Sequence, residues 1–541
     1  MYNPFIQIIT MCKDRSTFNH PLPLGRAWGE FVLLLLPFFL LACGGKVKVP
    51  TAFTEVSDSL IIYPDYRDVT IPPNIAPLNF MVQDERADAF VAEMGDLVCG
   101  ADVDGKLDID TAAWHQMLVR TAGQSLMVKV YARRNGQWVC YQPFKWNVAT
   151  DNIDPYLSYR LIEPGYELYR QLGLYQRNLT TFDEAVIYEN NRTFDENDNH
   201  CVNCHNYQNY DTQRMLFHVR AAHGGTVIVE GDQAHKIAIR HDSIISAGVY
   251  PSWHPSLPIV AFSTNRTGQV FHLKHPEKIE VMDLASDLLL YDVEHNTVCH
   301  ILRSTDAFET FPCWSPDGRR LYYCSAANHE LASDDAEHEF VQHYDSLLYD
   351  LWSIPFDPDT RQFGRPRLEV NARTVGKSVS VPRVSPDGRY LLFTLGDYGQ
   401  FHIWHKSADL WVKRLKAENQ DNPEFPDDPV SLEATDLYPL IAANAPDQPD
   451  SYHTWSSNGR WIVFSSRRDD GDFTRPYIAY FDQEGRAHKP FLLPQRDPEY
   501  NLLLLKSYNV PELTRTPLQV SHETLNHVVL HTDAQLATYT E

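Results

Sequence analysis

The stretch Trp314-Ser-Pro-Asp-Gly-Arg319, followed by the apolar run Leu321-Tyr-Tyr-Cys-Ser325, decides the fold of this chain. An aromatic residue, a Pro-Asp-Gly turn and a short apolar run together predict a tight β-hairpin, because the turn residues reverse the chain between two strands. Related copies recur roughly every 60 to 71 residues. These copies are Trp253-His-Pro-Ser before Ile259-Val-Ala-Phe-Ser263, Val384-Ser-Pro-Asp-Gly-Arg389 before Tyr390-Leu-Leu-Phe-Thr394, and Trp455-Ser-Ser-Asn-Gly-Arg460 before Trp461-Ile-Val-Phe-Ser465.

A second string follows most of these hairpins and supplies a third strand. It reads Asp287-Leu-Leu-Leu-Tyr-Asp292, Asp350-Leu-Trp-Ser-Ile354, Asp409-Leu-Trp-Val412 and Pro476-Tyr-Ile-Ala-Tyr-Phe-Asp482. A fourth strand is visible at Val298-Cys-His-Ile-Leu302. Four-stranded units in radial repetition are β-propeller blades. Four blades are plain, and the weaker segments 215–242 and 496–531 would complete six, so the sequence predicts a mainly β protein with a C-terminal six-bladed propeller.

These repeats resemble the WD-like repeats of the TolB propeller family over roughly residues 215–535. The resemblance implies a periplasmic platform for interactions between proteins. The repeat itself is specific for a propeller and not for an activity, since one fold hosts many functions. The chain departs from TolB in its leader, in a cysteine motif at residues 201–205, and in an N-terminal region that does not read as TolB's α/β domain.

The N-terminus carries a predicted leader. Residues 31–42 read FVLLLLPFFLLA, follow several basic residues and end directly before Cys43. This run is too short to span a bilayer of roughly 30 Å, and it resembles a bacterial lipoprotein signal. The resemblance implies cleavage before Cys43 and a lipid anchor at that thiol, which places the protein in the cell envelope, facing the periplasm, on the outer membrane of a Gram-negative bacterium. An ordinary secretory leader with an incidental Cys43, or a buried helix, is the alternative.

The motif Cys201-Val-Asn-Cys204-His205 has the spacing for covalent attachment of haem c. Two thiols at i and i+3 on a helical turn can add to the two vinyl groups of a haem, and the adjacent His205 then binds the iron. A redox dithiol and half of a zinc site are the alternatives, but the sequence has neither a thioredoxin-like context nor a second ligand pair at metal spacing. The motif occurs once, so one covalent haem is predicted.

The second axial ligand of the iron is open to three residues. Downstream of His205, the candidates in order are Met215, His218 and His223, and an open coordination position is also considered. A methionine ligand would raise the reduction potential, whereas a second histidine would lower it. Each residue also has an ordinary structural role available, as an apolar strand residue for Met215 and as solvated loop residues for the histidines.

The remaining N-terminal sequence predicts two further regions. Short alternating segments such as Ser125–Tyr131, with an opening strand near Pro72–Phe80, indicate an immunoglobulin or fibronectin-like sandwich. One helix is predicted over Tyr156–Asn190, leading to a loop-rich haem segment at the junction of the two domains. The predicted organisation is a signal peptide at 1–42, an immunoglobulin-like domain at 43–155, a helix and haem segment at 156–214, and the propeller at 215–541.

The charge balance restricts the partners. The 541 residues include 71 Asp and Glu against 47 Lys and Arg, a formal net charge of −24. A chain with this acidic balance is not expected to bind phosphate groups on its surface, so no nucleic-acid partner is expected. The same surface predicts a periplasmic redox or envelope partner that docks through a basic patch, while the lipid anchor holds the protein to the membrane.

The combined prediction is a membrane-anchored monohaem c-type cytochrome that transfers electrons, with the propeller as a docking scaffold or a shield for one face of the haem. No catalytic residue is identified, and an enzyme is not expected. Two alternatives remain. One is a TolB-like scaffold without a redox role. The other is a haem-dependent oxidoreductase with a second cofactor in the propeller, for which His402, His405 and His453 are the residues to inspect.

Overall fold

A computed structural model describes residues 47–163, 171–190, 199–275, 277–328, 343–415 and 436–541. The predicted leader and Cys43 lie outside the described residues. Within this part of the chain, no helix is long and apolar enough to cross a membrane.

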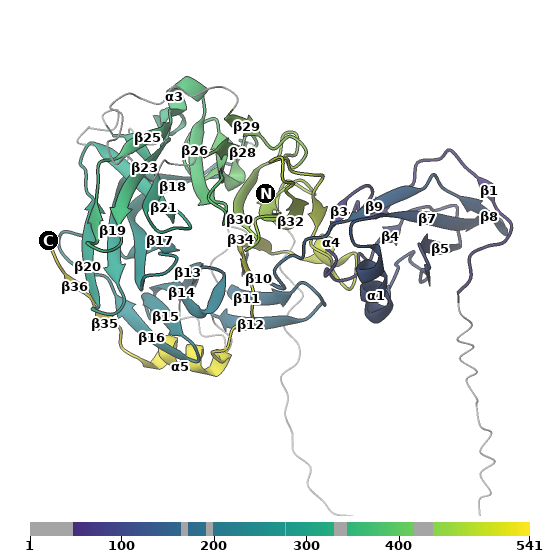
Figure 1. Ribbon diagram of the computed structural model, residues 1–541, viewed down its shortest axis with the longest axis horizontal. Helices are drawn as coiled ribbons and strands as arrows, with labels where there is room; N and C mark the ends of the chain where they lie inside the picture. Colours follow the sequence, from purple (N-terminus) through teal and green to yellow (C-terminus); the bar gives the residue numbers. More distant parts are fainter. Residues whose placement is uncertain (1–46, 164–170, 191–198, 276, 329–342, 416–435) are drawn as a thin grey trace, which may run out of the picture. The chain divides into compact units, whose positions relative to one another are not determined.

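Six sheets form a propeller (Figure 1), and all their strand pairs are antiparallel except those of the outermost strands β35 and β36, which pair in parallel. The innermost strand of each sheet contacts that of the next, and contacts of β34 with both β30 and β13 close the ring. The prediction of a mainly β fold with a six-bladed propeller is therefore confirmed. From the inner to the outer strand, blade 1 consists of β34 (Ser507–Thr514), β10 (Tyr156–Ile162), β11 (Gly173–Asn178) and β12 (Glu184–Glu189). Blade 2 consists of β13 (His200–Gln208), β14 (Asp211–Ala221), β15 (Gly225–Glu230), β16 (Gln233–Ala238) and β35 (Gln535–Leu536). Blade 3 consists of β17 (Gly248–Trp253), β18 (Ile259–Phe271), β19 (Ile279–Asp292), β20 (Thr297–Leu302) and β36 (Thr538–Tyr539).

The four plain repeats of the sequence contribute blades 3 to 6. Short helices α3 (Ala372–Val375), α4 (Tyr500–Leu503) and α5 (His522–His531) and two 3-10 turns, η1 (Tyr344–Ser346) and η2 (His402–Trp404), lie in the connections. Blade 4 consists of β21 (Ala307–Trp314), β22 (Arg320–Ala327), β23 (Asp350–Asp357), β24 (Gln362–Phe363) and β25 (Arg367–Val370). Blade 5 consists of β26 (Ser378–Val384), β27 (Tyr390–Gly396), β28 (Asp409–Arg414) and β29 (Leu437–Pro439). Blade 6 consists of β30 (Asp450–Trp455), β31 (Trp461–Ser466), β32 (Arg475–Tyr480) and β33 (Phe491–Leu492).

The Pro-Asp-Gly turns have the predicted hairpin geometry. In blade 4, Gly318 adopts φ +70° and its N–H donates to the carbonyl of Ser315 at 2.9 Å. The Asp317 carboxylate accepts from the Ser315 hydroxyl at 2.6 Å and from the N–H of Arg319 at 3.0 Å. A left-handed residue at this place favours glycine, which explains the repeated Gly in the sequence pattern.

Blade 1 is built from two parts of the chain that lie far apart in the sequence. Its inner strand β34 comes from the C-terminal region and pairs antiparallel with β10. Strands β10, β11 and β12 occupy residues for which the sequence predicts one helix, so that prediction is wrong for the described parts of Tyr156–Asn190. Residues 164–170 of the predicted helix lie outside the described residues. The propeller therefore begins at Tyr156 and not at residue 215, because β10 is the first of its strands along the chain. Residues 507–514 supply the remaining strand of blade 1.

Residues 54–148 form a seven-stranded mixed sheet, a separate two-stranded sheet of β2 and β4, and one helix, α1 (Thr111–Thr121). Strands β1 and β8, and β3 and β9, pair in parallel, which is not the pairing of an immunoglobulin sandwich, so that part of the prediction is not confirmed. Helix α1 starts at Asp110, whose side chain accepts from the N–H of Ala113 at 2.8 Å. The strands are β1 (Thr54–Glu55), β2 (Ile62–Tyr63), β3 (Thr70–Ile71), β4 (Met81–Val82), β5 (Ala89–Met94), β6 (Leu97–Gly100), β7 (Ser125–Arg134), β8 (Gln137–Cys140) and β9 (Phe144–Val148).

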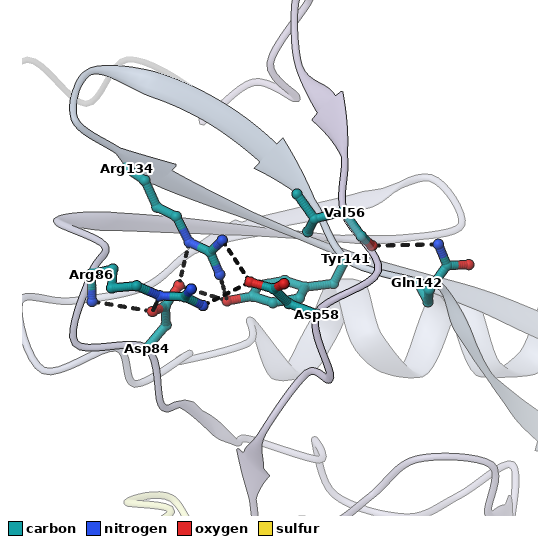
Figure 2. Close-up of polar contacts among 7 residues, drawn as sticks. All are labelled: Val56, Asp58, Asp84, Arg86, Arg134, Tyr141 and Gln142. Carbon is teal, nitrogen blue, oxygen red and sulfur yellow. Dashed lines mark hydrogen bonds and ion pairs between the residues drawn. The ribbon is translucent and has the colours of Figure 1, made fainter.

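A charged network ties the strands of this N-terminal sheet together (Figure 2). The Arg134 guanidinium contacts Asp84 at 2.7 Å and Asp58 at 2.9 Å, and Arg86 contacts the same two carboxylates at 3.1 and 2.8 Å. The Tyr141 hydroxyl donates to Asp84 at 2.7 Å. Burial opposes ionisation of Asp84, but the hydrogen bonds from Tyr141 and the two arginines hold its pKa well below its usual range.

The segment between β9 and β10 contacts blade 6 through polar groups. The Asp154 carboxylate accepts from the N–H and from the hydroxyl of Ser457, both at 2.6 Å. The indole N–H of Trp461 donates to the carbonyl of Asp151 at 3.0 Å. These bonds attach the residues before β10 to the hairpin of blade 6.

Candidate functional site in the propeller channel

Each of the six inner strands has one non-glycine residue in the left-handed region, at the same point of the strand. The strand ladder shifts register there in every blade, as in a β-bulge, which turns the side chain. All six residues line one cavity of about 450 Å³ in the channel, and we call them the channel ring. They are Val510 (φ 49°), Cys204 (51°), Tyr250 (47°), Phe311 (52°), Val381 (51°) and Tyr452 (45°).

The cysteine motif is part of this ring. Cys201, Cys204 and His205 lie on β13, the inner strand of blade 2, and all three line the cavity. The prediction of a loop-rich haem insert at a domain junction is therefore wrong, because these residues form a blade strand that is interrupted by one bulge. His205 follows the ring residue at the place where Pro251 and Pro312 stand in the next two blades.

The bulge brings both thiols to the same cavity. Residues i and i+3 of a regular strand point to opposite faces of the sheet, so Cys201 and Cys204 would be separated in an unbroken β13. The shift in pairing between Asn203 and Asn206 adds residues to one side of the ladder and removes that separation. Both cysteines are 8% exposed, and burial raises the pKa of the Cys201 thiol.

His205 presents a free ring nitrogen. Its Nε2 is buried and has no hydrogen-bond partner, so its hydrogen bond to the backbone of Ser158 comes from Nδ1. Burial lowers the pKa of His205 to about 3, which keeps the ring neutral at physiological pH. A neutral imidazole whose Nδ1–H is held by a backbone carbonyl leaves the Nε2 lone pair for a metal.

Glu512 lies beside this histidine. Its Oε2 is 3.9 Å from His205 Nε2 and has no hydrogen-bond partner, while its Oε1 accepts from Asn206 at 2.7 Å and from the N–H of Tyr207 at 3.1 Å. Burial raises the pKa of Glu512 to about 8. The bonds to β13 link blade 1 to blade 2, as the bond from the N–H of Trp253 to the Asn206 side chain at 2.9 Å links blade 2 to blade 3.

One of the three candidates for the second axial ligand reaches the cavity. His218 lines it, and its Nδ1 lies 3.1 Å from the hydroxyl of Thr226. Burial lowers the pKa of His218 to about 3. Met215 is fully buried in the apolar core of blade 2, and His223 stands in the turn after β14, with its ring against His200. Neither Met215 nor His223 lines the cavity.

The cavity wall is cationic although the chain as a whole is acidic. Four arginines and one glutamate line it, against a formal net charge of −24 for the chain. No local pattern in the sequence predicts that these five charged residues meet, because they come from four different blades. The five charged residues are Arg160, Glu163, Arg220, Arg383 and Arg467.

The histidines that would mark a second cofactor have protein partners. His402 Nδ1 lies 2.8 Å from the Ser380 hydroxyl, His405 Nε2 lies 2.7 Å from Glu280, and His453 Nε2 lies 3.2 Å from a backbone carbonyl. Across the described part of the chain, the one group of three or more possible metal ligands is Asp292, Glu294 and His295 in a surface turn. His405 and His453 each keep a buried Nδ1 without a hydrogen-bond partner, as His205 does at Nε2.

Comparisons with known proteins find weak likenesses among solved structures. No family model matches the chain, and no curated protein matches it. Among solved structures, TolB from Acinetobacter baumannii is similar over 71% of this chain and 78% of its own, at 10% identity and a TM-score of 0.37. Prolyl oligopeptidase B from Galerina marginata is similar over 62% of this chain and 44% of its own, at 10% identity and a TM-score of 0.34.

A DUF4784 family protein from Bacteroides caccae is similar over 81% of this chain and 98% of its own, at 6% identity and a TM-score of 0.27. Likenesses at this level carry no argument about activity. The topology of the six sheets establishes the propeller, and the resemblance to TolB extends to that fold and no further.

Proposed function

We propose that the propeller channel holds one covalently attached haem c and that the protein is a lipid-anchored electron-transfer protein of the cell envelope. One observation carries the proposal. Two thiols and a neutral histidine with a free Nε2 converge on a single buried cavity, in the order and spacing of a haem attachment motif.

The residues present fit the group. The Cys201 and Cys204 thiols would each add S–H across a vinyl double bond of the porphyrin, which forms two thioethers and needs no oxidant. His205 would bind the iron through Nε2, oriented by its Nδ1 bond to Ser158. A volume of about 450 Å³ falls within the roughly 300–1,000 Å³ of small-molecule and cofactor sites. When bound, the haem supplies one-electron chemistry between two iron oxidation states.

The channel walls would control that chemistry. Tyr250, Phe311 and Tyr452 of the channel ring would give a bound haem an aromatic wall on one part of the cavity, and the polarity of its surroundings is one determinant of the reduction potential. His218 is the candidate for the second axial ligand that lies in the cavity, and an open position is the alternative. A redox partner with a basic patch would complement the acidic surface of the chain.

An absorption spectrum tests the proposal. Full-length protein matured with haem-attachment machinery is expected to show a c-type spectrum that survives denaturation, because the haem is covalent. The Cys201→Ala plus Cys204→Ala variant should lose the covalent haem. The matched control is Cys99→Ala plus Cys299→Ala, which removes two half-buried thiols that do not line the cavity. A colourless wild-type protein would contradict the proposal.

A scaffold without a redox role is the second candidate. The observation that favours it is the position of Cys204, which is equivalent to Tyr250, Phe311 and the other members of the channel ring. The repeat of the blade can account for a residue at that place without any cofactor. In that case, the matured protein would remain colourless while its propeller stays folded and binds its partner.

A further inference from the structure

Two buried arginines at the channel have no anionic partner. Arg160 of β10 and Arg467, which follows β31, are 8% and 4% exposed, and both line the cavity. Among the described residues, no carboxylate forms an ion pair with either guanidinium within 4.0 Å. Their strands belong to the neighbouring blades 1 and 6.

Arg160 is held by β13 but keeps donors free. Its Nη1 donates to the carbonyl of Val202 at 3.2 Å and to the side chain of Asn203. Its Nε is buried without a partner, and its Nη2 has no hydrogen bond to the described residues. The side chain lies close enough to Cys201 and His205 for its charge to act on both.

Arg467 is positioned by backbone carbonyls and an aromatic ring. Its Nε donates to Ile403 at 2.8 Å, Nη1 donates to the carbonyl of Asp472, and the guanidinium lies 3.3 Å from the centre of the Trp404 ring. Its Nη2 has no hydrogen bond to the described residues. The exposed carboxylates of Asp470 and Asp472 stabilise its charge from a distance, but neither forms an ion pair with it.

Buried charges in proteins are ordinarily paired, because removing an ion from water is costly unless a counter-charge replaces the solvent. The two guanidinium groups leave unsatisfied donors and uncompensated charge in the same cavity wall. Arg220 and Arg383 also line the cavity, and among the described residues Glu163 is the one carboxylate that does so. Arginine recognises carboxylates through paired N–H donors, so the missing partner is an anion of that kind.

We propose that Arg160 and Arg467 bind the carboxylate groups of the molecule that occupies the channel. Two sources of carboxylate fit, namely the two propionates of a haem and a free dicarboxylate. The haem source rests on the proposed function, whereas the free dicarboxylate does not. Two neighbouring blades would then each hold one carboxylate of the ligand.

Metal-free porphyrin tests this inference without the iron bond to His205. The full-length Cys201→Ala plus Cys204→Ala protein is titrated with protoporphyrin IX, which has two free carboxylates, and with its dimethyl ester. Quenching of tryptophan fluorescence reports binding, since Trp404 lines the cavity. The diacid is expected to bind at least about tenfold more tightly than the ester, because charge-assisted hydrogen bonds are the stronger ones.

Arginine variants identify the groups responsible. Arg160→Gln and Arg467→Gln should each weaken diacid binding about tenfold and leave ester binding unchanged, and Arg160→Lys should restore part of the difference. Arg177→Gln is the matched control, because Arg177 is a buried arginine of blade 1 that does not line the cavity. A variant that misfolds loses ester binding as well, so the ester titration identifies it, and the wild-type diacid-to-ester ratio still decides.

The outcomes separate the inference from the proposed function. If the diacid binds and neither glutamine substitution changes its ratio to the ester, the inference is overturned while the haem proposal stands. If neither porphyrin binds but succinate does, in a manner that depends on Arg160, the inference stands with a free dicarboxylate, and the absorption spectrum of matured wild-type protein decides the haem proposal separately. If no carboxylate ligand binds more tightly than its ester, the arginines have no such role.

Discussion

Cys204 and Tyr250 occupy the same position on neighbouring inner strands, and both adopt a left-handed backbone, with φ of 51° and 47°. The second cysteine of the attachment motif is therefore also a member of the channel ring. A thiol replaces the larger apolar and aromatic side chains of the other blades, which opens the cavity next to His205. Cys204 therefore faces the cavity because of its position in the blade repeat, and this position brings the cysteine motif to the channel.

Cys204→Val tests this double role. Valine occupies the equivalent place in two other blades, at Val381 and Val510, so the fold should tolerate it and the melting temperature should change by no more than a few degrees. Haem matured on this variant is expected to retain one thioether, from Cys201, which shifts the α-band of the reduced spectrum. Extensive loss of stability would show that the thiol itself is needed for the strand.

Gly318→Ala is expected to lower the free energy of unfolding by about 2 kcal/mol or more, since the position combines strain and a clash. Gly318 has φ +70°, and an added Cβ would stand 2.3 Å from His254 Nε2. Gly376→Ala is the control, because φ there is +72° but no atom lies within 4 Å of the added carbon. It should cost only about 1 kcal/mol. Urea unfolding of both variants measures the difference, and equal losses would contradict the clash with His254.

Asp84→Asn is expected to destabilise the N-terminal sheet by about 1–3 kcal/mol at neutral pH, because it removes the negative charge that faces Arg134 and Arg86 and one of the two oxygens that accept hydrogen bonds there. The pKa of Asp84 is lower in the folded state than in the unfolded chain, so this contribution is present above about pH 4 and is lost as the solution is acidified. Denaturation of both proteins between pH 3 and pH 7 should show curves that converge at low pH. Asp88→Asn, at an exposed ion pair, should have a smaller effect.

Glu309 gives the opposite pH dependence. Burial, together with the nearby Asp287, raises its pKa to about 8, above the unfolded value near 4.5. Its contribution to stability is fully present below the unfolded pKa and declines as the pH rises toward 8. Glu309→Gln should therefore flatten the decline in stability between pH 5 and pH 9, whereas Glu294→Gln, in an exposed turn, should leave the profile unchanged. Parallel profiles for wild type and Glu309→Gln would exclude this role.

Cys43→Ser tests the predicted anchor. If the thiol carries the lipid, the variant should no longer incorporate labelled fatty acid and should move from the membrane to the soluble fraction. Two or more acyl chains hold a protein stably, so wild-type protein should remain bound in high salt. Substituting Cys12, within the predicted leader, is the control and should change neither result.

Turn chemistry made blades 3 to 6 predictable, because each carries its own hairpin signal, such as the Gly at position 318. Blades 1 and 2 lack that signal. Blade 1 pairs Ser158 with Glu512, and no local pattern reveals a contact over that separation. The first hairpin of blade 2 turns at Asn209 and Tyr210, both left-handed, instead of at a Pro-Asp-Gly turn.

The candidate site was only partly predictable for the same reason. Cys201, Cys204 and His205 are adjacent in the sequence, so their convergence could be anticipated, but their strand conformation could not. The bulge that places both thiols in one cavity depends on pairing with β14. Arg160 and Arg467 reach the cavity from different blades, and their proximity follows from closure of the ring. Helix α1 did have a local signal, the Asp110 cap before buried Trp114 and Leu118.

Closure of the ring through β34 has a consequence for biosynthesis. A ribosome makes Cys201, Cys204 and His205 some three hundred residues before the strand that completes blade 1. Until β34 docks against β10, Glu512 is absent from beside His205 and that side of the channel stays open. If a haem is attached as proposed, the two thiols would be most accessible to an attachment enzyme before β34 docks, and the last strand would then close the channel over the haem.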